Sequence, residues 1–309
     1  MRLTLCITLL AFAHTALAAP KSDSTAGQFI DKSIVTYPKS LGQYSLTRDF
    51  YDPTQPANGV SLRYELPDAP PDLAFDIFVY PLGRVDTPKA VTDAAVEMEG
   101  EIRALEQQKI YSDLKFDAAV PIDVTVPPSS MVKSDDKANA TSPVANGPTE
   151  TSSARPDSGA RAIVDAAIAS APPTMTTGRK RALTMTRRGT PSESLAYLFY
   201  RNLFLISVRA TVPSSTLPSG RFNALVDRAV QDLVPTIDIQ NFGKCATIYV
   251  DVGDKSADKE KETVAGAVEL VRGVNRVLRE NCSNEPGPDT APVTGRDKQT
   301  IVYPAGFWK

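Results

Sequence analysis

Alternating hydrophobic and polar positions predict three β-strands near the start of the chain, over residues 44–50, 60–66 and 73–80. In the second strand, leucine and tyrosine alternate with serine, arginine and glutamate, so one face is predicted to be buried and the other exposed to solvent. The third strand carries large apolar residues on both sides, which is typical of a central strand. Turn-forming residues separate the three segments.

Apolar residues recur at helical spacing in two later segments. The first helix is predicted from Thr87 to about Lys109, with Thr87 as the N-cap and Pro88 at the first helical position. The second is predicted to begin at a Ser219 cap and to stop at Pro235. Because the apolar residues of each helix lie on one side, we expect that side to be buried.

Further strands are predicted over residues 113–126, around Leu183 and Met185, and in a hairpin of residues 195–200 and 203–212. The order of elements predicts an α+β fold, in which a twisted antiparallel sheet is backed by amphipathic helices. A disordered insertion and a C-terminal strand-helix unit complete the predicted architecture.

Residues 127–178 are rich in proline, serine, threonine and alanine and contain no aromatic residue. Such a segment buries too little apolar area to offset an ordering entropy of roughly 1 to 2 kcal/mol per residue, so we predict that it is disordered. After it, a strand over residues 244–252 and a helix over residues 258–281 are expected. The predicted organisation is a signal peptide at 1–19, the first part of the α+β domain at 20–126, the insertion at 127–178, the second part of the domain at 179–240, a disulfide-linked strand-helix unit at 241–284 and a tail at 285–309.

The first 19 residues have the pattern of an export signal. Arg2 is followed by an apolar run over residues 3–12 and by the small-residue pattern Ala16-Leu17-Ala18. We therefore expect a periplasmic or secreted protein, and retention of the leader as a membrane anchor is the alternative. The leader also holds His14, the one histidine of the chain, so a cleaved protein would have none.

Charge and cysteine content fit that compartment. The chain has 34 basic and 36 acidic residues, a balance that argues against a nucleic-acid partner. Cys6 leaves with the leader, whereas Cys245 and Cys282 remain as an even pair in an oxidising compartment. A helix returning along a strand would place Cys282 beside Cys245, so a disulfide is predicted; two separate buried thiols are the alternative.

The stretch from Tyr200 to Thr211, together with Tyr80-Pro81-Leu82-Gly83, is similar to uncharacterised secreted proteins of proteobacteria. The order of strands and helices from Tyr44 to Ile237 also resembles the PsbP-like α+β fold. The first resemblance implies an exported protein, and the second implies an antiparallel sheet backed by helices. Neither implies a catalytic residue.

The sequence contains few of the residue combinations that are typical of catalytic sites. Without histidine, Ser-His-Asp and Cys-His mechanisms and histidine-containing zinc sites are excluded from the cleaved chain, and no cofactor or metal is predicted. Asp76, in the middle of an apolar strand, is the carboxylate of most interest, although we expect a structural ion pair or exposure at a sheet edge before a catalytic role. Burial would raise its pKa unless a cation such as Arg63 or Arg209 lies across the sheet. Glu97 and Glu101, four residues apart on one helix, could pair for acid-base chemistry, but we expect them to form an exposed polar side of that helix.

Two other groups are candidates for binding. A basic cluster is predicted to meet anions or, alternatively, to form the wet side and ends of a strand; it consists of Arg179, Lys180, Arg181, Arg187 and Arg188. The C-terminal segment carries aromatic residues that are predicted either to dock a partner or to pack back onto the domain: Tyr303, Phe307 and Trp308.

We therefore expect an exported protein without catalytic activity that serves as a binding or interaction module of the cell envelope. Its partner would be an envelope protein or another envelope component. A hydrolase using carboxylates and an accessory subunit docking through the aromatic tail are the two alternatives.

Overall fold

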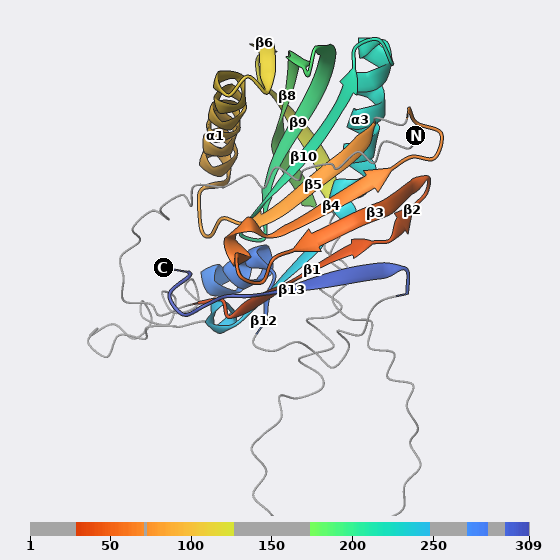
Figure 1. Ribbon diagram of the computed structural model, residues 1–309. Helices are drawn as coiled ribbons and strands as arrows, with labels where there is room; N and C mark the ends of the chain where they lie inside the picture. Colours follow the sequence, from red (N-terminus) through yellow and green to blue (C-terminus); the bar gives the residue numbers. More distant parts are fainter. Residues whose placement is uncertain (1–28, 71–72, 127–173, 248–270, 284–293, 309) are drawn as a thin grey trace, which may run out of the picture.

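The computed structural model describes residues 29–70, 73–126, 174–247, 271–283 and 294–308. The predicted export signal, the insertion up to residue 173 and the segment 248–270 lie outside these described residues. Within them, the chain forms two β-sheets, with helices packed on the larger sheet (Figure 1). The α+β class predicted from the sequence is confirmed.

The larger sheet is antiparallel between all neighbouring strands of the described chain. Its strands follow the order β2 (Ser40–Leu41), β3 (Tyr44–Tyr51), β4 (Val60–Glu65), β5 (Ala74–Pro81), β10 (Phe204–Pro213), β9 (Thr190–Arg201), β8 (Thr174–Arg187) and β6 (Tyr111–Phe116), and β7 (Val120–Val126) also pairs with β8. Strands β9 and β10 form the predicted hairpin, which turns at Asn202 and Leu203. Both turn residues have positive φ angles, of 51° and 71°. The central position predicted for β5 is confirmed.

The smaller sheet brings the two ends of the described chain together. Its strands follow the order β12 (Cys282–Ser283), β11 (Asp238–Phe242), β1 (Lys32–Pro38) and β13 (Arg296–Val302). The sequence predicted neither β1 nor β13. Strand β1 is short and buried on both faces, and β13 has few buried side chains of its own, so neither shows a clear alternation. Pairing across more than 250 residues, such as Val35 with Gln299, creates both strands.

Helices α1 (Thr87–Gln107) and α3 (Ser219–Leu233) lie on opposite faces of the larger sheet (Figure 1). The apolar side of α1 packs in one cluster with Leu183 and Leu198. The apolar side of α3 packs in another cluster with Tyr197 and Phe199. Because successive residues of a strand point to opposite faces, Tyr197 and Phe199 of β9 face α3 while Leu198 between them faces α1. Both predictions of a buried helix side are confirmed.

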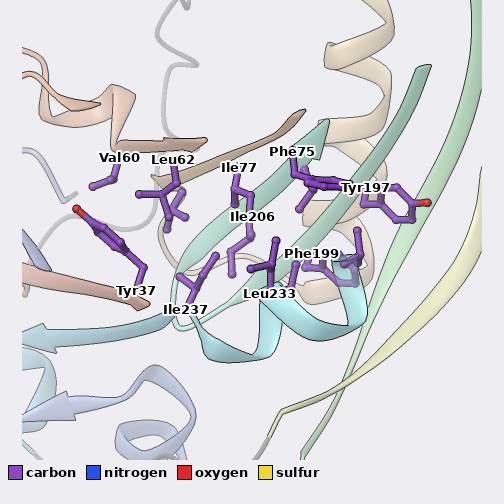
Figure 2. Packing of buried hydrophobic residues seen from close by; sticks show 14 of the residues in the cluster. Tyr37, Val60, Leu62, Phe75, Ile77, Tyr197, Phe199, Ile206, Leu233 and Ile237 are labelled. Atoms are coloured by element: carbon purple, nitrogen blue, oxygen red, sulfur yellow. The ribbon is translucent and has the colours of Figure 1, made fainter. Parts of the chain in front are cut away.

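The main core fills the space between the larger sheet, α3 and the smaller sheet. Figure 2 shows side chains from these parts meeting, among them Tyr37 from β1, Leu62 from β4, Ile77 from β5 and Phe199 from β9. Each of these four side chains is at most 2% exposed. Ile237, which follows the single turn η2 (Val234–Thr236), closes the cluster next to α3.

The helix starts differ from the prediction in their caps. The carboxylate of Asp86 accepts a hydrogen bond from the backbone N–H of Lys89, so Asp86 and not Thr87 is the N-cap of α1. The Ser219 hydroxyl does not cap α3, because it donates instead to Oε1 of Glu193 on β9 at 2.6 Å. The Ser219 hydroxyl is thus bonded to a neighbouring strand, and α3 begins without a side-chain cap.

Some strand boundaries also differ from the prediction. The strand expected over residues 113–126 is divided into β6 and β7, which both pair with β8. Strand β8 begins at Thr174, so residues 174–178 belong to the sheet and not to the insertion. Val126 pairs with Thr174, which means that the chain leaves and re-enters the sheet at neighbouring positions. Lys244–Ala246 forms the turn η3 where a strand was expected, because the strand of this region is β11, immediately before it.

A disulfide joins Cys245 to Cys282, with a distance of 5.9 Å between the Cα atoms, as predicted. Residues 271–280, just before Cys282, are helical. This confirms the C-terminal part of the helix predicted over residues 258–281, whose first part lies outside the described residues. One side of these helical residues faces solvent and carries three apolar side chains that are 40% to 58% exposed: Val271, Val274 and Leu278.

Candidate binding face on the larger sheet

Helix α1 covers only part of its face of the larger sheet. It packs on β8 and β9, where Leu183, Met185 and Leu198 join its apolar side. In the described part of the chain, no helix covers the same face of β3, β4 and the Asp76–Phe78 part of β5, which lie farther along the sheet (Figure 1). Tyr80 of β5 packs against the cluster under α1. We call this uncovered area the open face and define it by Arg48, Phe50, Ser61, Arg63, Asp76 and Phe78.

A row of charged side chains crosses the open face at one level of the sheet. In the strand register Arg48 of β3 lies opposite Arg63 of β4, and Arg63 lies opposite Asp76 of β5. On the other side of Asp76, its partner in β10 is Arg209. The sequence named Arg63 and Arg209 as cations that could lie across the sheet from Asp76, and both arginines do.

Direct bonds connect part of this row. The Arg63 guanidinium donates from Nη1 to Oδ1 of Asp76 and from Nε to Oε1 of Glu65, both at 3.2 Å. The side chains of Arg63 and Asp76 are 35% and 34% exposed, so the pair is partly accessible from solvent. A group approaching the face would meet a carboxylate and a guanidinium side by side.

Burial and the neighbouring charges act on Asp76 in opposite directions. Burial is the larger effect and raises the pKa of the Asp76 carboxyl, whereas Arg63, Arg48 and Arg209 lower it. Burial likewise lowers the pKa of Arg209, opposed by nearby groups that include Glu101 and Asp76. Glu101 on α1 and Asp76 on β5, both candidates from the sequence, therefore both raise the pKa of Arg209.

Glu97 and Glu101 also act together on a tyrosine of β5. Burial is the main reason that the pKa of Tyr80 is raised, and the two glutamates raise it further. The side of α1 that carries these glutamates therefore borders the face on which Tyr80 lies. This neighbourhood follows from the packing of α1 and was not predicted from the sequence.

Two phenylalanines lie in the next row of the open face. Phe50 on β3 pairs with Ser61, and Ser61 pairs with Phe78 on β5. The Phe50 side chain is 55% exposed, and Phe78 is half-buried. The sequence did not single out Phe50 or Arg48. An irregularity in the β3–β4 register between Leu46 and Arg48 obscures the alternation that would have assigned them to the outer side.

A depression continues the open face at one end. Its volume is about 420 Å³, and it is lined by residues of β3, β4 and the loop that follows: Ser45, Thr47, Glu65, Leu66, Pro67, Ala69, Pro70 and Leu73. Glu65 belongs to this lining and is bonded to Arg63, so the depression and the charged row share one ion pair. Together they form a continuous surface of mixed charge with an apolar border.

The basic cluster predicted from the sequence does not gather into one patch. Lys180 points to the α3 face, where its ammonium lies 2.8 Å from a carboxylate oxygen of Asp227. Arg181 points to the α1 face, where Nη1 lies 2.6 Å from Oε2 of Glu99. Alternation along β8 separates these two cations, and each already faces a carboxylate. Arg179 shares the α1 side through its partner Leu198, and the exposed Arg187 and Arg188 lie at the β8–β9 turn.

The aromatic C-terminal segment packs onto the domain, which was the alternative to docking. Tyr303 and Trp308 are 4% and 5% exposed, and Phe307 is half-buried. The Tyr303 hydroxyl donates to Oγ of Ser33 on β1 at 3.1 Å, and the indole of Trp308 packs against the ring of Phe29. A docking role for this segment stays a prediction and would require these rings to leave the core.

The fold and the open face define an α+β protein with a partly uncovered antiparallel sheet. The chain matches no protein-family model and no curated protein at a significant level. The residues that the structure describes hold no group of three or more metal-ligating side chains. None of the helices they form is long and apolar enough to cross a membrane.

Proposed function

We propose that this protein is a non-catalytic binding module of the cell envelope and that it holds its ligand on the open face. The observation that supports this most is the exposed ring of Phe50 beside the Arg63–Asp76 pair. Exposed large apolar groups next to convergent polar groups are typical of binding surfaces.

Export is part of the same proposal. The leader pattern at residues 1–19 and the Cys245–Cys282 disulfide both suit an oxidising compartment outside the cytoplasm. Cell fractionation followed by intact-mass measurement tests this part. We expect the chain in the envelope or medium fraction, cleaved after Ala18 or Ala19; a cytosolic chain that keeps its leader would contradict it.

Crosslinking and pull-down from the protein's own envelope tests the binding function. We expect the wild-type chain to capture an envelope component and Phe50→Ala to lose most of it. Val302→Ala is the matched control, because Val302 is a strand residue that is 61% exposed and lies on the smaller sheet. Equal capture by wild type, Phe50→Ala and Val302→Ala would refute the open face as the binding surface.

A carboxylate hydrolase is the second candidate. Asp76 and Glu101 both act on Arg209, and burial raises the pKa of Asp76, as an acid catalyst requires. Turnover of a captured ligand that is lost in Asp76→Asn would favour the hydrolase. Capture without turnover, retained in Asp76→Asn at reduced affinity, would favour the binding module.

A further inference from the structure

The charges of the open face point to the kind of ligand that it accepts. The row runs in the order Arg48, Arg63, Asp76 and Arg209, and Glu65 is bonded to Arg63 at one side. Asp76 and Glu65 face the three guanidinium groups of the row, and Glu101 acts on Arg209 from α1, so the charges nearly cancel and no simple ion meets groups of one sign. The row instead offers donors and acceptors a few ångströms apart.

Hydroxyl groups suit such a row better than either kind of ion. A hydroxyl donates one hydrogen bond and accepts others, so two adjacent hydroxyls can bridge the Arg63 guanidinium and the Asp76 carboxylate. Hydrogen bonds between hydroxyl groups and these charged side chains are stronger than hydrogen bonds between neutral groups. The partly exposed Arg63–Asp76 pair, with its atoms 3.2 Å apart, has the geometry to bind them.

The phenylalanines supply the other half of the surface. Phe50 and Phe78 lie two residues along their strands from Arg48 and Asp76, a spacing of about 7 Å, with the strands about 5 Å apart. A ligand that covers both rows must have an apolar face and a hydroxyl-rich edge within about 7 Å. Sugar rings have this combination. A peptide added as a strand fits less well, because it would pair with a sheet edge, whereas Phe50, Arg63 and Asp76 project from the face of the sheet. Strands β4 and β5 are paired on both sides, and β3 pairs with β2 on its outer side at Tyr44 and Ser45.

We propose that the ligand of the open face is a hydroxyl-rich sugar chain. Its rings lie against Phe50 and Phe78, its hydroxyl groups bridge Arg63 and Asp76, and the chain runs toward the depression next to Glu65. This proposal rests on the binding function proposed above and adds the chemical class of the ligand.

Isothermal titration calorimetry of the purified chain with three probes tests the class. The probes are a neutral hexasaccharide, a uronate hexasaccharide of equal length and a lysine-glutamate hexapeptide. We expect the neutral sugar to bind, Phe50→Ala to weaken it about 3- to 10-fold and Asp76→Asn to weaken it as well. Arg103→Ala is the control that removes a similar ion pair, with Glu99 on α1, and should bind like wild type. Circular dichroism checks that each variant is folded.

The outcomes separate the two proposals. If no sugar binds but envelope capture still depends on Phe50, the sugar class is refuted and the binding function stands. If no sugar binds and Phe50→Ala captures the envelope component as well as wild type does, both the sugar class and the binding function of the open face are refuted. Binding of the uronate alone, abolished by salt, would show an anion site and overturn the sugar proposal. Light scattering that shows a dimer lost in Phe50→Ala would identify a second copy as the occupant and overturn it too.

Discussion

The two faces of β5 differ in what covers them. On one face Phe75, Ile77 and Val79 are fully buried under α3 and the smaller sheet. On the other face Asp76, Phe78 and Tyr80 are only half-buried, because α1 covers the sheet at β8 and β9 and not at β4. The covered face stabilises the fold, whereas the open face carries polar and aromatic groups that the core does not need.

The largest expected effect compares two phenylalanines of this one strand. Phe75→Ala should lower the free energy of unfolding by about 3 to 5 kcal/mol, since it leaves a cavity in the main core. Phe78→Ala on the open face should cost about 1 kcal/mol or less, because its ring is half-buried and solvent can occupy the space. Urea denaturation monitored by circular dichroism measures both. Similar losses would mean that the open face is part of the core.

The covered face is also what the sequence predicted best. Strict alternation in β4, apolar residues on both sides of β5 and helical spacing in α1 and α3 predicted the layers of the fold. These patterns are local, so a single sequence carries them. The strands β1 and β13 were missed because pairs such as Val35 with Gln299 connect distant parts of the chain, and no local pattern encodes them.

The open face was predicted only in part, for a similar reason. Asp76 was recognised as a charge in an apolar strand, and Arg63 and Arg209 were named as cations that could lie across the sheet from it. Phe50 was not recognised, because its exposure depends on how far α1 extends over the sheet. The basic cluster on β8 was predicted as one group, but alternation sends Lys180 and Arg181 to opposite faces.

Loss of the disulfide should have the next largest effect. Cys245 and Cys282 are 37 residues apart and belong to the main core, and the chain-entropy relation gives a contribution of about 4 kcal/mol for a loop of this size. The double variant Cys245→Ser/Cys282→Ser should therefore unfold at lower urea concentration. Under native conditions the double variant should still bind its ligand on the open face. A variant as stable as wild type would contradict the role given to the bond.

Tyrosine ionisation gives a pH test of the covered face. Burial is the main cause that raises the pKa of Tyr44 to about 12, and it raises those of Tyr37, Tyr64 and Tyr197 further. A raised pKa means that the fold favours the neutral phenol, so this contribution to stability is complete below about pH 10 and is lost as the pH rises above it. Ultraviolet absorbance should therefore show these tyrosines ionising together with unfolding. Ionisation near pH 10 in a folded chain would contradict their burial.

The smallest expected effect concerns the Arg63–Asp76 pair. Because a third of each side chain is exposed, a double-mutant cycle with Arg63→Ala and Asp76→Asn should give a coupling of about 0.2 to 1 kcal/mol, which decreases in high salt.

Burial raises the pKa of Asp76 above its ordinary value of 3.8, so the native state binds this proton more tightly than the unfolded state does. The contribution of Asp76 to stability should then fall as the pH rises through that raised pKa, and Asp76→Asn should remove this dependence. Urea unfolding of wild type and Asp76→Asn between pH 3 and pH 7 measures it. A wild-type chain that gained stability over this range through Asp76 would show that the arginines outweigh burial, and the pair would then act as a structural ion pair and not as a site held ready for a ligand.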